Sequence, residues 1–478
     1  MTTPLLSEHA GLAALEQRLA QDLAWLDLPS KPWVPQASVN GQDLLDVAII
    51  GGGMAGMATA VALQHMGVRA RIFDGAVSGF EGPWATTARM ETLRSPKQLT
   101  GPALGLPALT FRAWFEAQYG RQAWDALDKI PRLQWMAYLR WYRRVMSLDI
   151  QNEHHVKNII PHADHVDLQI QTPSGEIHVY ARRVVLATGR AGLGGAYVPD
   201  FIKNIGHEFW AHSSDTTDYS ALRGLRVGVV GAGASAMDSA GTALENGAAR
   251  VDLLIRRADI PRVNKGKGAS NAGFTNGYLG LPDQWKWRVR HYINEQQVPP
   301  PQASVRRVSR HANAYFNLGS PVQNVIQKDG HLHVETPKKN FELDFLILAT
   351  GFFIDWHARS EYATIARHVR VWGDRYQPNA GEKDKELEGA PDLGVNFEFQ
   401  EKSSDPLPGL SRVHCFCYPA TLTHGTVSGD IPAISDGAER VSKGIVRLLF
   451  VENIDQHFNE LQAFDEPEIV GDEWAAAA

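Results

Sequence analysis

Three glycines, Gly51, Gly53 and Gly56, follow the apolar run 46–50 with the spacing G-x-G-x-x-G. The first glycine of such a turn lets the chain pass sharply from strand to helix, the second lets a diphosphate approach the backbone, and the third lets the helix pack close to the strand. The diphosphate then lies at the positive end of the helix. Asp74 ends the next apolar run, where an acid accepts a ribose hydroxyl. The spacing therefore predicts a dinucleotide-binding turn.

A second turn of this kind follows another apolar run, with Gly231, Gly233 and Ala236 at the corresponding positions. Alanine is tolerated at the third position of the fingerprint. The strand that follows ends in Arg256 and Arg257 instead of an acid. Because guanidinium groups bind phosphate oxygens through paired hydrogen bonds, this ending favours NADP(H) over NAD(H). The alternative is that the arginines simply face solvent at the end of a strand.

The runs 184–189 and 345–351 both end in Ala-Thr-Gly. A strand-rich stretch with turn signals precedes each run, at 173–175 in one case and at 328–330 in the other. The chain therefore contains two copies of one unit. Each copy consists of a fingerprint βαβ, a hairpin region and an apolar strand that ends in Ala-Thr-Gly.

Composition excludes several other classes of protein. The chain has 478 residues and a formal net charge of −6, which argues against a nucleic-acid-binding protein. Only two cysteines, Cys415 and Cys417, are present, so a disulfide-stapled secreted scaffold is excluded, and both are expected to be buried. The first residues lack the features of a secretory signal, and no apolar run approaches the ~20 residues that a membrane helix needs. We therefore expect a cytoplasmic protein with no membrane partner and, since the histidines show no ligand spacing, no metal.

Helical patterns flank the two units. Leucines spaced by three and four residues over 7–26 predict an N-terminal helix. Apolar residues from Ala438 to Phe450 predict a last helix, with Pro432 in its first turn. The polar segment 374–390 is expected to be an exposed crossover.

Two such units, the second inserted into the first, resemble the two-dinucleotide-binding-domain flavoproteins over roughly residues 45–450. Within that group the chain looks most like the class B flavin-dependent monooxygenases, which include the flavin-containing and the N-hydroxylating monooxygenases. Gly82-Pro-Trp84 resembles the Gly-x-Trp flavin segment of the family, 344–352 resembles its Ala-Thr-Gly-Tyr/Phe signature, and 423–425 resembles the His-Gly of the amino-acid N-hydroxylases. A disulfide reductase of the same group would carry its redox cysteines far earlier than Cys415.

The resemblance implies an α/β fold with two nested Rossmann-like dinucleotide-binding domains, an FAD domain with an inserted NADPH domain, plus an N-terminal helix. The expected boundaries are an N-terminal helical arm over 1–44, the first part of the FAD-binding domain over 45–195, the NADP(H)-binding domain over 196–375, and the second part of the FAD-binding domain, with the C-terminal helix, over 376–478.

The resemblance also implies positions for the functional side chains. Arg94 and Lys97 lie in a segment that lines the flavin and the substrate in the family, so they are expected to hold a phosphate, the nicotinamide or an anionic substrate, unless they face water. Asp430 is expected either to cap the last helix or to bond the ribityl chain. The segment 260–320 is expected to form a clamp on the 2′-phosphate or a lid. The catalytic candidates are Arg94, Lys97 and His424, and the candidates for cofactor contact are Gly51, Gly53, Met54, Ala55, Gly56, Asp74, Gly82, Trp84, Arg94, Thr188, Gly189, Gly231, Gly233, Ala234, Ser235, Ala236, Arg256, Arg257, Thr350, Gly351 and Asp430.

In this family NADPH reduces FAD, the reduced flavin forms a C4a-(hydro)peroxide with oxygen, and a nucleophilic substrate takes the distal oxygen. The resemblance therefore implies an NADPH- and O2-dependent FAD monooxygenase that acts on a small molecule. An amine nitrogen, giving N-hydroxylation, or a sulfide is the expected nucleophile. Two alternatives remain open: a flavoprotein reductase that passes electrons to a partner or quinone without oxygenation, and a non-enzymatic FAD/NADP(H) sensor. The sequence leaves open the substrate itself and whether the chain forms a homo-oligomer.

Overall fold

The first glycine turn belongs to a seven-stranded sheet, and the structure, a computed structural model, describes residues 11–474. The strands of this sheet are β3 (Leu45–Ile50), β4 (Ala70–Phe73), β5 (Ile150–Gln151), β6 (His155–Pro161), β7 (Val166–Thr172), β8 (Gly175–Leu186) and β19 (Val413–Cys415). They run in the order β5-β4-β3-β8-β7-β6, with β19 beside β8. β5, β4, β3, β8 and β19 are parallel, while β6, β7 and β8 form the antiparallel region expected before the first Ala-Thr-Gly.

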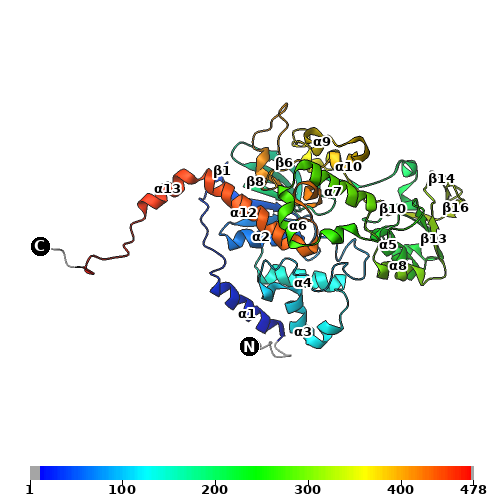
Figure 1. Ribbon diagram of the computed structural model, residues 1–478, viewed down its shortest axis with the longest axis horizontal. Coiled ribbons are helices and arrows are strands. Elements are labelled where there is room, and N and C mark those ends of the chain that lie inside the picture. Colours follow the sequence, from blue (N-terminus) through cyan, green and yellow to red (C-terminus); the bar gives the residue numbers. More distant parts are fainter. Residues whose placement is uncertain (1–10, 475–478) are drawn as a thin grey trace.

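The second glycine turn belongs to a parallel sheet of its own (Figure 1). Its strands are β10 (Trp210–His212), β11 (Arg226–Val230), β12 (Arg250–Ile255), β13 (Ala314–Leu318) and β17 (Phe345–Leu348), in the order β10-β17-β11-β12-β13. An antiparallel sheet of β14 (Asn324–Lys328), β15 (His331–Glu335) and β16 (Asn340–Leu343) precedes β17, as the turn signal at 328–330 predicted. The two units therefore share one plan.

The second unit is inserted into the first. β19 lies beyond the whole second unit in the sequence, yet it pairs in parallel with β8, with His414 opposite Val185. The helix that follows, α12 (Ile434–Glu452), packs against α2 (Met54–His65), the helix of the first glycine turn. This arrangement confirms the predicted α/β class of two nested Rossmann-like domains. The domain boundaries drawn from the sequence stay predictions.

The two Ala-Thr-Gly ends meet in a short ribbon. β9 (Gly194–Ala196) follows the first end, β18 (Phe352–Ile354) follows the second, and these strands pair antiparallel with Phe353 opposite Gly195. The Tyr197 N–H also donates to the Gly351 carbonyl at 2.9 Å. Both chain crossovers between the units are therefore fixed to each other, a contact that neither motif predicts by itself.

A helical layer covers one side of the first unit. It contains α1 (Gly11–Trp25), α3 (Phe111–Ala126) and α4 (Arg132–Val145), and α1 packs against α3. Phe111, Trp135 and Tyr138 pack together in its core. α1 agrees with the predicted helix over 7–26, of which residues 7–10 lie outside the described residues, as does the start of the chain on which the secretory-signal expectation rests.

The segment 374–390 is largely exposed, as its polar composition suggested, but it also forms local structure. It contains α10 (Lys385–Glu388), beside α9 (Trp372–Arg375), and both pack near α7 (Asp283–Gln296). Trp372, Leu387 and Trp287 are buried in one cluster there. The helices α9 and α10 are four residues long each, so their few buried side chains among many charged ones show no helical periodicity in the sequence. The remaining short elements are α5 (Ala234–Glu245), α6 (Ala272–Gly277), α8 (Gln302–Ser309), α11 (Thr421–His424), β1 (Ser38–Val39) and β2 (Gln42–Asp43).

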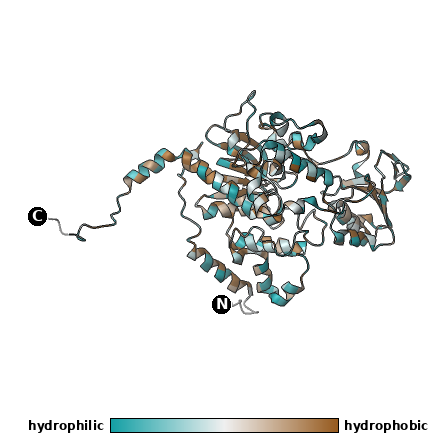
Figure 2. Ribbon diagram, in the orientation of Figure 1, coloured by the Kyte–Doolittle hydropathy of each residue, from teal (hydrophilic) through white to brown (hydrophobic). Residues whose placement is uncertain are grey.

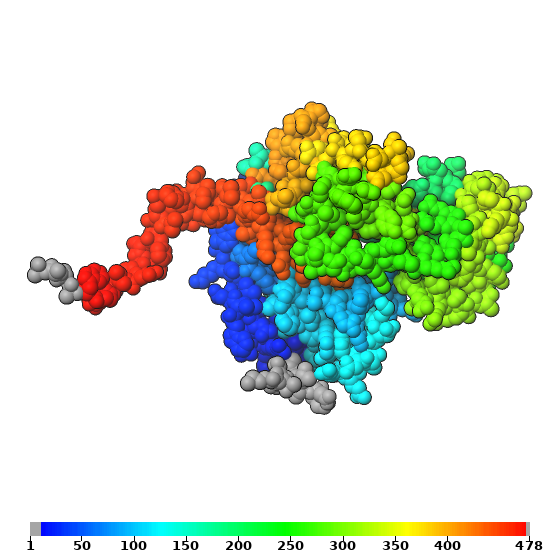
Figure 3. All heavy atoms as spheres, in the orientation of Figure 1, coloured from blue at the N-terminus to red at the C-terminus, as the bar shows by residue number. Residues whose placement is uncertain are grey.

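The chain ends in an arm that leaves the body of the molecule, as Figure 3 shows. It begins after α12 with α13 (Ile454–Ala463), which carries hydrophobic and hydrophilic residues side by side (Figure 2). Phe458 and Leu461 on this helix are exposed. Among residues 11–474, no helix combines the length and the apolar character that crossing a membrane requires.

Candidate active site

The three glycines of the first turn have three distinct surroundings. Gly51 has φ +107°, and a Cβ there would lie 2.5 Å from the Ala187 carbonyl oxygen. A Cβ on Gly56 would lie 1.9 Å from the Gly51 carbonyl oxygen. On Gly53, by contrast, the nearest atom would be the Gly82 Cα at 4.0 Å. Gly51 and Gly56 therefore allow the fold, whereas Gly53 leaves space beside the backbone, as a diphosphate site requires.

The first turn of α2 offers unused hydrogen-bond donors. Gly53 is the N-cap residue and no side chain caps the helix, so the amides at Met54 and Ala55 stand at a positive helix end. Asp74 accepts hydrogen bonds from the Gly52 N–H at 2.6 Å and the Ala76 N–H at 2.7 Å. Burial raises the pKa of Asp74 above its usual range, and these bonds oppose that rise. Each carboxylate oxygen keeps a lone pair that could accept a ribose hydroxyl.

The second turn repeats this geometry on α5. Gly231 has φ +135°, and its Cβ would lie 2.6 Å from the Ala349 carbonyl oxygen, whereas a Cβ on Gly233 would meet nothing within 4 Å. The buried Ala236 methyl group would lie 3.5 Å from that added Cβ, an ordinary contact distance. No side chain caps α5, and Ser235 is exposed in its first turn beside the buried Ala234.

The two arginines at the end of β12 differ in their contacts. Arg257 is half-buried and donates to the Glu295 carbonyl at 3.1 Å. Arg256 is exposed and has no hydrogen bond or ion pair within the part of the chain that the structure describes. Arg256 is therefore the better placed of the two to bind a phosphate.

The Ala-Thr-Gly ends leave both glycines in left-handed backbone, at φ +78° for Gly189 and +88° for Gly351. Thr188 donates to the Gly192 carbonyl at 3.3 Å, and Thr350 donates to the Tyr197 carbonyl. Arg190, which the sequence analysis did not select, lies 4.2 Å from the centroid of the Tyr418 ring. Its position directly after Thr188-Gly189 was the sequence feature that could have identified it as a candidate for cofactor contact.

Arg94 lies where the first unit faces the second. Its side chain is exposed to solvent, yet surrounding protein desolvates it enough to lower its pKa, while Asp238 of α5 acts in the opposite direction. Gly82 lies beside Gly53, and the half-buried Trp84 packs edge-on against Trp135 with ring centroids 6.4 Å apart. Arg94 is therefore positioned to reach a ligand bound between the units.

The ammonium group of Lys97 is engaged by the protein backbone. Its ammonium group donates to the carbonyls of Trp124 at 2.7 Å, Asp125 at 3.2 Å and Leu127 at 2.5 Å, where α3 ends. An ammonium group has three donors, so these bonds occupy it fully. The side chain stabilises a helix C-terminus, and a catalytic role has no support from this geometry.

His424 is also enclosed. It is fully buried, its Nε2–H donates to the Gly394 carbonyl at 3.0 Å, and it stacks on Phe397 with centroids 3.6 Å apart. Burial lowers its pKa to about 3. The imidazole is held by the Gly394 carbonyl and by Phe397, so the geometry supports a structural role for His424 at the back of the wall that Gly394 and Thr423 form. The His-Gly motif could not reveal this because Phe397 comes from a distant segment.

Asp430 precedes α12 without capping it. Its side chain makes no capping hydrogen bond at the 3-10 turn that leads into the helix, and it is exposed while nearby protein raises its pKa. The capping role therefore has no support from the structure, and contact with the ribityl chain stays a prediction.

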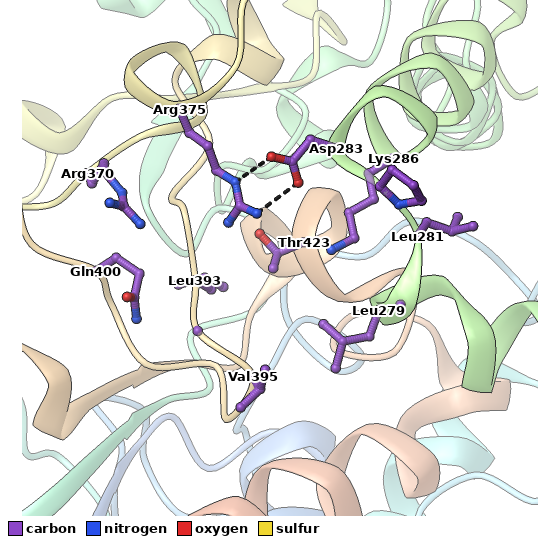
Figure 4. A pocket seen from close by; sticks show the side chains of 13 residues that line it. Leu279, Leu281, Asp283, Lys286, Arg370, Arg375, Leu393, Val395, Gln400 and Thr423 are labelled. Atoms are coloured by element: carbon purple, nitrogen blue, oxygen red, sulfur yellow. Dashed lines mark hydrogen bonds and ion pairs between the residues drawn. The ribbon is translucent and has the colours of Figure 1, made fainter.

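A cavity of about 590 Å³ lies beside α7 and α11 (Figure 4). Lys286, Arg370 and Arg375 supply its charge, and Thr423 lies at its wall. None of the residues expected to contact a cofactor lines it. Lys286 was missed, although it is part of the unusual Trp285-Lys-Trp287, because only the packing of α7 shows which face is buried.

The comparisons with known proteins agree with this architecture. Residues 48–268 match the pyridine nucleotide-disulphide oxidoreductase family model. The FAD-dependent urate hydroxylase of Xanthomonas campestris pv. campestris is 37% identical over 462 residues, which cover 96% of this chain and 98% of that protein.

Solved structures share the fold at low identity. The ornithine hydroxylase of Pseudomonas aeruginosa superposes with a TM-score of 0.66 at 15% identity, covering 84% of this chain and 99% of that one. The FAD-bound cadaverine monooxygenase of Erwinia amylovora superposes with a TM-score of 0.63 at 14% identity, covering 91% and 99%. Two nested nucleotide-binding units, together with a hydroxylase relative that matches along almost the whole length, show that the chain belongs to the class B flavin-dependent monooxygenases.

Proposed function

We propose that this enzyme uses NADPH and O2 to hydroxylate a small substrate with FAD as its cofactor, and that urate is the first substrate to test. The observation that carries the proposal is the pair of open glycine turns, at Gly53 and Gly233, on two units whose crossovers are joined by β9 and β18. The urate assignment rests on the FAD-dependent urate hydroxylase that is 37% identical over nearly the full chain.

The residues of the first unit suit FAD. The amides at the start of α2 would hold the diphosphate, and Asp74 would accept the ribose hydroxyls. Asp430 and the Thr188-Gly189 end would contact the remainder of the cofactor. When bound, FAD supplies the transfer of electrons and the activation of oxygen.

The second unit would bind NADPH in a similar way. The amides at the start of α5 would hold its diphosphate, with Ser235 exposed among them. Arg256 would bind the 2′-phosphate, which distinguishes NADPH from NADH. Arg94 would bind the nicotinamide half or its phosphates, because it faces α5 from the first unit.

The expected amine substrate has less support than urate. It rested on the two glycine turns together with the His-Gly motif, and the His424 side chain is fully buried. The ornithine hydroxylase and the cadaverine monooxygenase share 15% and 14% identity with this chain, a level at which the likeness concerns the fold. Amines and sulfides therefore belong in the substrate screen as the second choice.

Oxygen balance distinguishes a hydroxylase from a reductase. We expect the FAD-loaded enzyme with NADPH and urate to consume one O2 per NADPH, with one oxygen atom in the organic product and the other in water. Under 18O2, mass spectrometry should find one labelled oxygen in the freshly formed product. NADPH oxidation that quantitatively yields hydrogen peroxide, whichever urate, amine or sulfide is added, would contradict the proposal and favour the reductase.

A further inference from the structure

The cavity beside α7 draws its walls from segments far apart in the sequence. Residues 279–286, 370–375 and 393–400 contribute most of the lining, and Thr423 of α11 completes it. The apolar part is formed by Leu281, Leu393 and Val395, among others. Its volume of about 590 Å³ is in the range of small-molecule sites.

The two arginines of the cavity are already neutralised. Arg370 donates to Asp392 at 2.7 Å, and Arg375 donates to the other oxygen of Asp392 at 2.7 Å. Arg375 also binds both oxygens of Asp283, at 2.7 and 2.8 Å. Asp392 is fully buried. The two carboxylates are thus engaged by two guanidinium groups, and neither bonds a third cation.

Among the residues that line the cavity, Lys286 carries the positive charge that no carboxylate neutralises. The residue is 5% exposed, and its ammonium group makes no hydrogen bond or ion pair with any residue in the described range 11–474. Figure 4 shows its end pointing into the cavity toward Thr423. An ammonium group at a cavity wall that no carboxylate of the described protein neutralises is available to bind an anion, and partial loss of solvent strengthens that attraction. Burial indeed lowers the pKa of Lys286, although Asp283 and Asp392 act against that shift.

We propose that this cavity binds a small organic monoanion with an apolar or planar body, and that Lys286 is the group that binds its charge. One net positive charge predicts one negative charge on the ligand, and the leucine and valine walls require an organic body rather than an inorganic ion. The Gln400 amide at the wall supplies a neutral polar contact. The ligand could be the substrate, which for urate rests on the proposed function, or a separate effector with the same chemistry.

The test is calorimetric titration of the oxidised, FAD-loaded enzyme without NADPH, so that no turnover occurs. The probes are urate and benzoate, both monoanions at pH 7.5. Lys286→Met keeps the unbranched chain and removes the charge, and Lys286→Gln serves as a second variant should the first fold poorly. Lys443→Met is the matched control, since Lys443 is exposed on α12 and pairs with Glu439 at 3.2 Å.

We expect the Kd of the bound anion to rise about 10-fold or more in both Lys286 variants, the scale of one charged hydrogen bond, and to change little in the control. A parallel rise in the KM for urate identifies the ligand as the substrate. A rise in the Kd for benzoate alone, with an unchanged KM for urate, identifies a separate effector site.

The inference and the proposed function fail in different ways. An unchanged Kd for both anions in the Lys286 variants, or no anion binding to the wild-type enzyme at millimolar concentration, overturns the inference even where urate is hydroxylated. If benzoate binding depends on Lys286 but the enzyme does not hydroxylate urate, the anion site in the cavity is supported and urate is refuted as the substrate.

Discussion

Gly56 stands so close to Gly51 that a Cβ on it would lie 1.9 Å from the Gly51 carbonyl oxygen. The carbonyl oxygen belongs to the backbone and a Cβ is fixed to its Cα, so no side-chain rotation could relieve this contact. Gly53 lies within the same motif, yet a Cβ there would find its nearest neighbour 4.0 Å away. Helix packing therefore requires Gly56, whereas the proposed diphosphate would require Gly53, and substitution separates these roles.

We expect Gly56→Ala to destabilise the first unit by about 3 kcal/mol or more, because an inserted methyl group must displace backbone. Gly53→Ala should leave the free energy of unfolding of the FAD-free protein within about 0.5 kcal/mol of wild type, since the site is open. The same methyl group should lower FAD occupancy by occupying the space for the diphosphate. Urea unfolding of the FAD-free protein and flavin absorbance after purification measure the two effects. Full FAD occupancy in Gly53→Ala would contradict this assignment.

How much the sequence could predict depends on the range of the contacts involved. The glycine turns, their strands and the Ala-Thr-Gly ends were predictable because each is set by neighbours within a few residues. Lys97 and His424 were not, because their partners lie elsewhere, at the end of α3 and at Phe397. Lys286 was hidden for the same reason, since its cavity is assembled from four separate segments.

Lys97→Met tests the structural role assigned to that residue. The ammonium group bonds three carbonyls at the end of α3, including that of Leu127 at 2.5 Å. We expect its loss to lower the free energy of unfolding by about 1–3 kcal/mol, with kcat/KM per folded, flavin-loaded enzyme nearly unchanged. Lys157→Met is the control, because Lys157 is exposed on β6. A large fall in kcat/KM with unchanged stability would restore Lys97 as a catalytic residue.

Buried histidines should make the enzyme sensitive to mild acid. Burial lowers the pKa of His424 to about 3, whereas an unfolded histidine titrates near pH 6.5. Between these values the unfolded chain binds a proton that the folded chain does not, so stability falls as the pH falls. The slope for one such histidine is about 1.4 kcal/mol per pH unit, or about 2 kcal/mol between pH 7 and pH 5. Urea unfolding at both pH values should show a loss smaller by about 2 kcal/mol in His424→Gln, and no such difference in His357→Gln, whose side chain is exposed.

The contacts of Arg256 and Arg257 predict unequal shares in the choice of nicotinamide cofactor. Arg256 is exposed and unpaired among the described residues, whereas Arg257 already donates to the Glu295 carbonyl at 3.1 Å. We expect Arg256→Ala to reduce the ratio of kcat/KM for NADPH to that for NADH by about 10- to 150-fold, the equivalent of one charged hydrogen bond of about 1.5–3 kcal/mol. Arg257→Ala should have a smaller effect, and Arg262→Ala, which removes an exposed arginine paired with Asp259 at 2.9 Å, should have almost none. Equal ratios in wild type and Arg256→Ala would show that the 2′-phosphate is bound elsewhere, and steady-state kinetics with both cofactors decides between these outcomes.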